Sequence, residues 1–298
     1  RIVSGSRVPL ASSCSKAATP AVWGEAMLVP DMRVVPPPAF SDTFIGYRYS
    51  SHFSDPGKKK DVAKHIAQLT HVSTYALGQQ FANLDVFKSD HNDPKKDSDS
   101  GATEIYLTYR NQLQYGRIFD KPLALGPVRD VALTMGLDWN TKNNAFQSRK
   151  RMVVIGPTLK FALPAGFLDL SLYYAREWNH CGLDICDLPG NHSSMLFDPF
   201  YQLNLTWGVP FAVGSVPMKF QGFYSYNTEK GDDYRNNPTA DEQLMRTSLM
   251  IDAGQLVGAR KNVFWIGPGY EYWRNKFGNR KGEGIDVDAL SINLEWHL

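Results

Sequence analysis

Two neighbouring stretches decide the fold, VRDVALTMGLDWN at 128–140 and RKRMVVIGPTLKFAL at 149–163. Every second residue of the first is large and apolar: Val131, Leu133, Met135 and Leu137. The residues between them are small or polar. The second stretch alternates in the same way, with these residues on its apolar side: Val153, Ile155, Leu159 and Phe161. A period of two places each set on one face of a strand, so both stretches predict long strands with one apolar and one polar face.

The same rhythm runs from residue 42 to the end of the chain and predicts an all-β, antiparallel up-and-down barrel of about twelve strands. The expected strands are 42–50, 64–75, 80–88, 102–114, 128–140, 149–163, 166–178, 197–208, 217–227, 243–255, 261–273 and 285–297. Many are longer than the usual strand of a globular protein and suit a tilted strand that crosses a bilayer.

The breaks between these strands alternate in character. The odd breaks, such as 89–101 and 228–242, are mostly long and charged, whereas the even ones, such as 76–79 and 164–165, are mostly short. The break at 115–127 is the exception. A meander places odd and even breaks at opposite rims, and outer-membrane barrels have long outer loops and short periplasmic turns.

Composition excludes several classes of protein. The 298 residues carry 32 basic and 30 acidic side chains, so no field of one sign indicates a nucleic-acid partner. No apolar run is long enough for a helical membrane span. Aromatic residues are 12% of the chain and gather near strand ends, as the interfacial girdles of a membrane barrel do. A soluble, carbohydrate-binding β-sandwich has a similar alternation and stays open as an alternative.

Charged residues inside the predicted strands fall mostly on the face opposite the apolar one. In a membrane barrel that face lines the lumen, where charged groups can meet a polar solute or brace the wall. The candidate lining residues are Arg48, Asp85, Glu104, Arg110, Asp138, Lys160, Arg246 and Glu271, with Asp169, Lys219 and Asp252 in the same pattern. Phe223 and Trp265 share that face and are candidates for stacking on a flat solute.

Three cysteines bear on redox state and metals. Cys181 and Cys186 lie five residues apart in CGLDIC and are candidates for a loop disulfide, with free thiols as the other option. Zinc needs more ligands than the nearby His180 and His192 supply, so no metal site is expected.

Residues 1–40 mix small residues, proline and scattered charge. We expect a poorly ordered remnant of an export signal and a linker, followed by the barrel at 41–298.

Five stretches resemble the Tsx-like family of nucleoside-specific outer-membrane channels. They are SDTFIGYRYSSHFSDPG at 41–57, THVSTYALGQQFANLDVFKSDHNDP at 70–94, GATEIYLTYR at 101–110, LALGPVRDVALTMGLDWNTKN at 123–143 and GYEYWRNKFGN at 269–279. The resemblance implies a monomeric twelve-stranded barrel in the outer membrane of a Gram-negative bacterium, surrounded by lipid, which takes up nucleosides passively.

No enzyme signature accompanies this pattern: the sequence has no nucleophile elbow, P-loop, zinc-protease motif or dinucleotide fingerprint. We therefore expect a channel for nucleosides or similar small polar solutes, without enzymatic activity and without a cofactor. An outer-membrane barrel with a structural or adhesive role, whose lumen does not conduct, is the main alternative.

Overall fold

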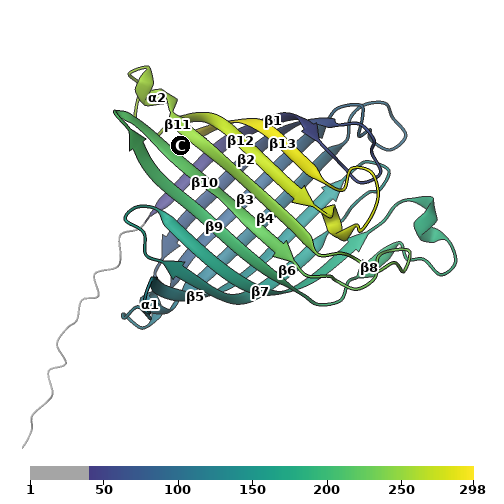
Figure 1. The fold of residues 1–298 in the computed structure, drawn as a ribbon, viewed down its shortest axis with the longest axis horizontal. Helices are drawn as coiled ribbons and strands as arrows, with labels where there is room; N and C mark the ends of the chain where they lie inside the picture. The colour runs from purple at the N-terminus through teal and green to yellow at the C-terminus, as the bar shows by residue number, and fades with distance from the viewer. Residues whose placement is uncertain (1–39) are drawn as a thin grey trace, which may run out of the picture. The chain divides into compact units, whose positions relative to one another are not determined.

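The computed structural model describes residues 40–298, which form a single antiparallel sheet closed into a barrel (Figure 1). The strands are β1 (Ser41–Phe53), β2 (Val62–Tyr75), β3 (Gly78–Ser89), β4 (Thr103–Gln114), β5 (Val128–Lys142), β6 (Arg151–Phe161), β7 (Phe167–His180), β8 (Ser194–Leu196), β9 (Phe200–Val213), β10 (Val216–Asn227), β11 (Glu242–Asp252), β12 (Phe264–Arg274) and β13 (Val287–His297). All of them except the three-residue β8 belong to the barrel wall, so the predicted twelve-stranded barrel is confirmed.

The wall is a meander in which sequence neighbours pair, with two further pairings. The first strand pairs with the last, from Phe44↔His297 to Tyr49↔Ile292, and β7 pairs with β9 beyond the β8 excursion. Each wall strand therefore has a neighbour on both sides. This closure gives backbone N–H and C=O groups partners within the sheet, which hydrocarbon cannot supply.

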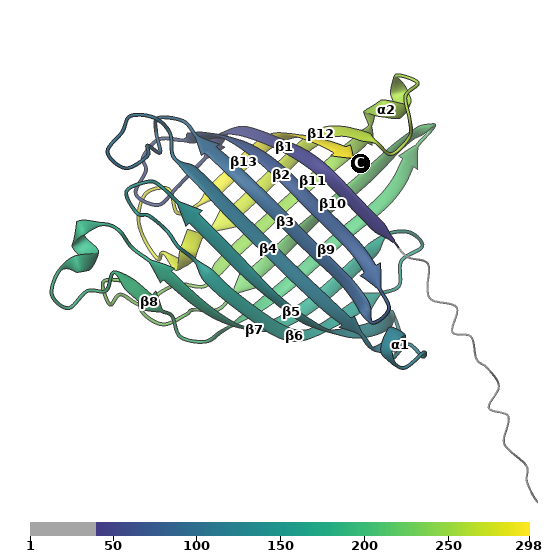
Figure 2. The same cartoon turned by 180° about the vertical axis from the view of Figure 1, so that it is seen from behind.

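The two rims differ (Figures 1 and 2). One carries tight turns, the chain's C-terminal end and two single-turn helices, α1 (Tyr115–Ile118) and α2 (Ala253–Leu256). The other carries the long loops, β8 and the short 3-10 turns η1 (Asp184–Asp187) and η2 (Lys276–Gly278). The break at 115–127 is long because it holds α1, which explains the exception to the alternating pattern. Among residues 40–298, no helix has the length and apolarity to traverse a bilayer.

Side chains alternate between an apolar exterior and a polar interior. On β6, Ile155 is 45% exposed, whereas Thr158 is 0% and Lys160 is 3% exposed. Leucine, isoleucine and valine side chains lie exposed all around the outside of the wall. An apolar band of this extent on a closed barrel is the surface that lipid covers.

Some predicted boundaries were wrong. Strand β9 continues to Val213, so the expected break at 209–216 shrinks to a turn at 214–215. Strand β11 ends at Asp252 instead of 255, because the Asp252 carboxylate accepts a hydrogen bond from the Gln255 amide and caps α2. The export-signal and linker assignment for residues 1–40 lies, apart from Phe40, outside the described residues.

Two adjacent residues of β9 test which face meets lipid. A charge at the bilayer midplane on the lipid face costs about 2–4 kcal/mol, and less on the lumen face. Leu205 points outward and its neighbour Thr206 inward, where Thr206 pairs with Phe223. We expect Leu205→Arg to lower the fraction that folds into lipid vesicles more than Thr206→Arg does, measured by heat-modifiable electrophoretic mobility. Equal losses for the two variants would contradict the assignment of faces.

Candidate functional site

Four charged side chains meet inside the barrel and form what we call the central constriction: Arg48 of β1, Asp85 of β3, Arg246 of β11 and Glu271 of β12. Arg246 and Glu271 are register partners on adjacent strands, with Nη2 of the arginine 2.9 Å from Oε2 of the glutamate. Asp85 Oδ2 lies 3.6 Å from Nη2 of Arg48 and 3.8 Å from Nη1 of Arg246.

The contact between Asp85 and Arg246 spans the lumen. Four strands, β2, β1, β13 and β12, separate β3 from β11 on the shorter way around the wall. An ion pair between two such strands has to cross the interior. Side chains fill the barrel at this level, because Arg48 is 6%, Asp85 4% and Glu271 5% exposed.

The charges of the central constriction cancel, since it holds two guanidinium and two carboxylate groups. Arg48 is nevertheless incompletely satisfied: Nε and Nη2 of its guanidinium are buried and have no hydrogen-bond partner among the described residues. Buried polar groups in proteins are nearly always bonded, so these two nitrogens are candidates to donate to acceptor atoms of another molecule, water included.

A further ion pair, between Arg110 and Asp138, lies beside the central constriction. Arg110 Nη1 donates to Asp138 Oδ1 at 2.6 Å, and the Tyr106 hydroxyl donates to Asp138 Oδ2 at 3.0 Å. Gly136, the register partner of Arg110, makes this possible, since a Cβ there would overlap the arginine side chain. The Arg110 guanidinium carbon is 6.0 Å from the centroid of the Tyr173 ring on β7.

Further ion pairs follow elsewhere along the interior. Lys160 Nζ donates to Asp169 Oδ2 at 2.6 Å and to Gln112 Oε1 at 2.8 Å, which links β6 with β7 and β4. Lys219 is paired with Glu295 and lies 4.7 Å from the centroid of the Trp265 ring. Each of these pairs joins one positive and one negative side chain.

The rim with the long loops holds a group that we call the Asp55 cluster. Asp55, in the loop after β1, forms three ion pairs. Its carboxylate oxygens lie 2.7 Å from Nζ of Lys64, 3.0 Å from Nζ of Lys142 and 2.8 Å from Nζ of Lys276. Burial by itself would raise the pKa of the Asp55 carboxyl, but the three ammonium groups outweigh burial and hold that pKa well below its usual range. Lys142 also reaches Asp93 at 2.8 Å. The cluster thus ties the loops after β1 and β12 to strands β2 and β5.

The predicted lining residues all lie on strands whose alternation turns them inward, but they separate into groups. Arg48, Asp85, Arg246 and Glu271 come together in the central constriction, while Arg110 and Asp138 form their own pair. Glu104 accepts from Asn140 Nδ2 at 2.7 Å, nearer the Asp55 cluster. Phe223 lies beside the constriction, with its ring centroid 5.6 Å from the Arg246 guanidinium carbon. Asp252 also lies on the inward face, opposite Trp265, and its carboxylate caps α2.

Sequence reasoning missed the Asp55 cluster. Lys142 follows from the alternation Asp138, Asn140, Lys142 once β5 is extended by two residues. Asp55 and Lys276 lie in loops, where no periodicity gives the direction of a side chain.

The loop between β7 and β9 contains the disulfide Cys181–Cys186, so these two sulfurs are not zinc ligands. Within residues 40–298, no group of three or more histidine, cysteine, aspartate or glutamate side chains is arranged to hold a metal ion.

Comparison with known proteins gives matches among solved structures alone. No protein-family model matches the chain, and no curated protein sequence does. The KdgM porin has 8% sequence identity and a TM-score of 0.39, with 85% of this chain and 98% of that one covered. The NanC porin has 11% identity and a TM-score of 0.42, covering 87% and 100%. The translocator domain of the autotransporter NalP from Neisseria meningitidis has 10% identity and a TM-score of 0.42, covering 87% and 88%.

The architecture itself gives the location. A closed antiparallel barrel with an apolar outer band, a charged interior and rims of unequal loop length is the design of Gram-negative outer-membrane proteins. The chain is an outer-membrane β-barrel with a polar lumen. The rim with the long loops is the outer one, and the rim with α1 and α2 faces the periplasm.

The Asp55 cluster generates a prediction about stability. Asp55→Asn removes the charge that compensates three buried ammonium groups, and breaking a buried ion pair in this way costs about 3–5 kcal/mol. Because the folded-state pKa of Asp55 is depressed, its contribution is complete above the ordinary value of 3.8 and is lost as the pH falls through the folded-state value. We expect the variant to unfold at lower denaturant concentration at neutral pH, and the difference from wild type to shrink in acid.

The matched control is Asp61→Asn, which removes an exposed carboxylate from the same loop and should leave the unfolding midpoint unchanged. A difference between wild type and Asp55→Asn that stays constant down to strongly acidic pH would contradict the role assigned to this charge.

Proposed function

We propose that the protein is a passive channel for small, neutral, polar solutes across the outer membrane. The observation that carries the proposal is the central constriction: its charges sum to zero, and the buried Arg48 has donors without partners. A site with excess positive charge favours anions, and one with excess negative charge favours cations. A neutral group with free donors instead favours an uncharged solute with acceptor atoms.

Passage through the lumen needs side chains to move, but not the backbone. The barrel at this level is filled by long, flexible side chains, and the contact of 3.8 Å between Arg246 and Asp85 that crosses it is longer than a direct hydrogen bond. A solute that separates Asp85 from Arg246 leaves neither charge unpaired, because Asp85 keeps Arg48 and Arg246 keeps Glu271 as an ion-pair partner.

Nucleosides are the solutes that fit best. They are neutral, carry hydroxyl and base oxygens that accept hydrogen bonds, and present a flat aromatic face. Phe223 beside Arg246 provides a ring for such a face next to the charged group. The resemblance of five stretches to the Tsx-like family supports the same substrate class. Trp265, 6% exposed beneath Lys219, is the second aromatic candidate.

A non-conducting structural barrel is the second candidate, and the same interior favours it. Ion pairs that cross the lumen stiffen a narrow barrel, and fully buried lining residues leave little water in the pathway. Electrical recording distinguishes the two functions.

Ion selectivity tests the constriction. Asp85→Asn leaves a net positive charge there and should shift the reversal potential in a salt gradient toward anions, whereas Arg246→Gln should shift it toward cations. Asp288→Asn and Arg274→Gln are the matched controls, because this pair, 2.8 Å apart, lies on the lipid-facing side of the wall. The absence of any current from correctly folded wild-type protein would favour the structural barrel instead.

Block of the current tests the solute. We expect nucleosides to reduce single-channel current, and Phe223→Ala to weaken that block about tenfold, since stacking on one base contributes about 1–3 kcal/mol. Phe220→Ala, on the outer face of the same strand and 42% exposed, should leave the block unchanged. Trp265→Ala probes the second aromatic ring in the same way. If nucleosides do not affect the current while another solute class blocks it, the proposed channel function is supported and nucleosides are the wrong substrate.

A further inference from the structure

Three arginines on the outer wall lack acidic partners. Arg151 is the first residue of β6, Arg149 lies in the loop just before it, and Arg176 faces outward near the outer end of β7. Among residues 40–298, no carboxylate is paired with any of the three. The contrast with Arg274 is clear, because that arginine also faces outward at the outer rim but is paired with Asp288 at 2.8 Å. Three like charges gathered on one surface repel each other, and a bound anion would relieve that repulsion.

The arginines lie at the level of the outer membrane interface. Arg151 has Trp139 as its register partner on one side and Trp178 on the other. Tryptophan rings on the outside of a membrane barrel mark the headgroup region. The Arg151 guanidinium carbon lies 4.7 Å from the centroid of the Trp139 ring, and Nη1 donates to the carbonyl oxygens of Asn140 at 2.9 Å and Lys150 at 2.7 Å. Arg151 is therefore held in place before any ligand arrives.

The three side chains are close enough to act together. Arg176 is the register partner of Val153, which makes it the diagonal neighbour of Arg151 on the adjacent strand. Diagonal neighbours on one face are about 7–8 Å apart, within reach of long side chains. Arg149 precedes Arg151 by two residues, and its backbone N–H donates to Asn179 Oδ1 at 2.9 Å.

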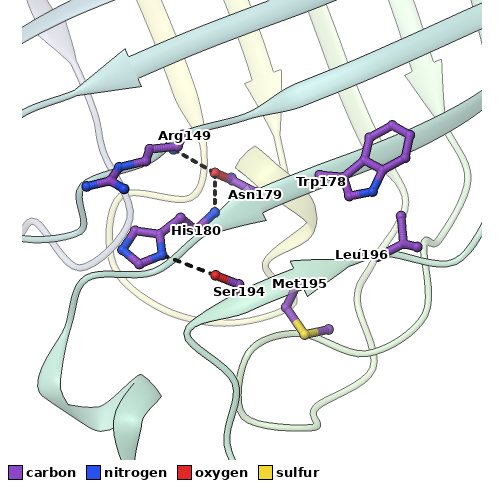
Figure 3. Close-up of a pocket in the computed structure, with 7 residues that line it drawn as sticks. All are labelled: Arg149, Trp178, Asn179, His180, Ser194, Met195 and Leu196. Atoms are coloured by element: carbon purple, nitrogen blue, oxygen red, sulfur yellow. Dashed lines mark hydrogen bonds between the residues drawn. The ribbon is translucent and has the colours of Figure 1, made fainter.

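Arg149 lines a hollow of about 370 Å³ whose other lining residues come from the end of β7 and from β8 (Figure 3). The side chains of Arg149 and His180 lie at one end of it, and those of Trp178 and Leu196 at the other. Trp178 is 41% and Leu196 48% exposed. The hollow thus places a cationic end next to an apolar end, on a surface that lipid covers.

We propose that this face of β6, β7 and β8 binds a phosphorylated glycolipid of the outer leaflet, with lipid A of lipopolysaccharide as the chemical type. The guanidinium groups of Arg149, Arg151 and Arg176 contact the phosphate, which arginine binds through two parallel hydrogen bonds. The apolar surface of Trp178 and Leu196, which lie level with Arg151 across the strands, contacts the apolar part of the lipid beside its phosphate. The tryptophans beside Arg151 place the three arginines at the level of the lipid headgroups, where phosphate groups lie. The site is independent of the channel proposed above.

Native mass spectrometry of the folded protein in detergent micelles tests the proposal. The probes are bisphosphorylated lipid A, the same lipid without its phosphates, and phosphatidylglycerol. We expect the wild type to retain bisphosphorylated lipid A selectively. The triple variant Arg149→Ser, Arg151→Ser and Arg176→Ser should weaken this binding by on the order of a hundredfold.

The matched control removes three cations from the periplasmic rim, where Arg129, Arg260 and Lys261 are all exposed, by serine substitution. It should bind lipid A as the wild type does. Heat-modifiable mobility verifies that each variant is folded, and Trp178→Ala provides a second variant that weakens binding without changing charge. Equal binding of dephosphorylated lipid A, equal binding of phosphatidylglycerol, or an equal loss in the control variant would each overturn the proposal.

Discussion

The structure depends on one constraint, that no backbone N–H or C=O group is left unbonded in hydrocarbon. A flat sheet of these strands in chain order would expose two edges, β1 and β13, and the pairing of β1 with β13 removes both. Once the sheet is closed, each strand has an inner and an outer face, and the period of two distributes its residues between them. The apolar exterior, the charged interior and the difference between the rims all follow from that closure.

Charge in the interior is arranged by local compensation. Arg246 with Glu271, Arg110 with Asp138 and Lys160 with Asp169 each join groups of opposite sign on neighbouring strands. In a space of low dielectric constant, an unpaired charge is costly, and a pair with further hydrogen bonds is tolerated. The consequence is an interior that is strongly polar and nevertheless close to neutral, which is a different environment from a lumen of one sign. The outer wall shows the opposite case, since three arginines there have no partner within the described chain.

Alternation in the sequence was sufficient to predict the barrel and the inward direction of residues such as Asp85 and Arg246. It could not predict that these two side chains meet, because their contact depends on the width of the barrel and on the reach of both side chains across it. The turn at 214–215 was placed too early because VPFAV reads equally well as strand or as loop. The contact between Asp55 and Lys276 could not be predicted for another reason: both lie in loops, and loop conformation arises from tertiary contacts that no periodic pattern encodes.

The Asp55 cluster has a consequence for how the barrel is assembled. Asp55 is separated from Lys142 by 87 residues and from Lys276 by 221. Contacts of such sequence separation form late, because loop-closure entropy opposes them until much of the chain is in place. Lys276 lies in the loop between β12 and the last strand, β13, which also pairs with the first. A partly inserted chain without β12, β13 and the loop between them therefore lacks both the β1–β13 pairing and the Asp55–Lys276 ion pair. The same C-terminal segment supplies both contacts. Closure of the barrel wall and attachment of the outer loops therefore occur together during folding, when the C-terminal segment joins the barrel.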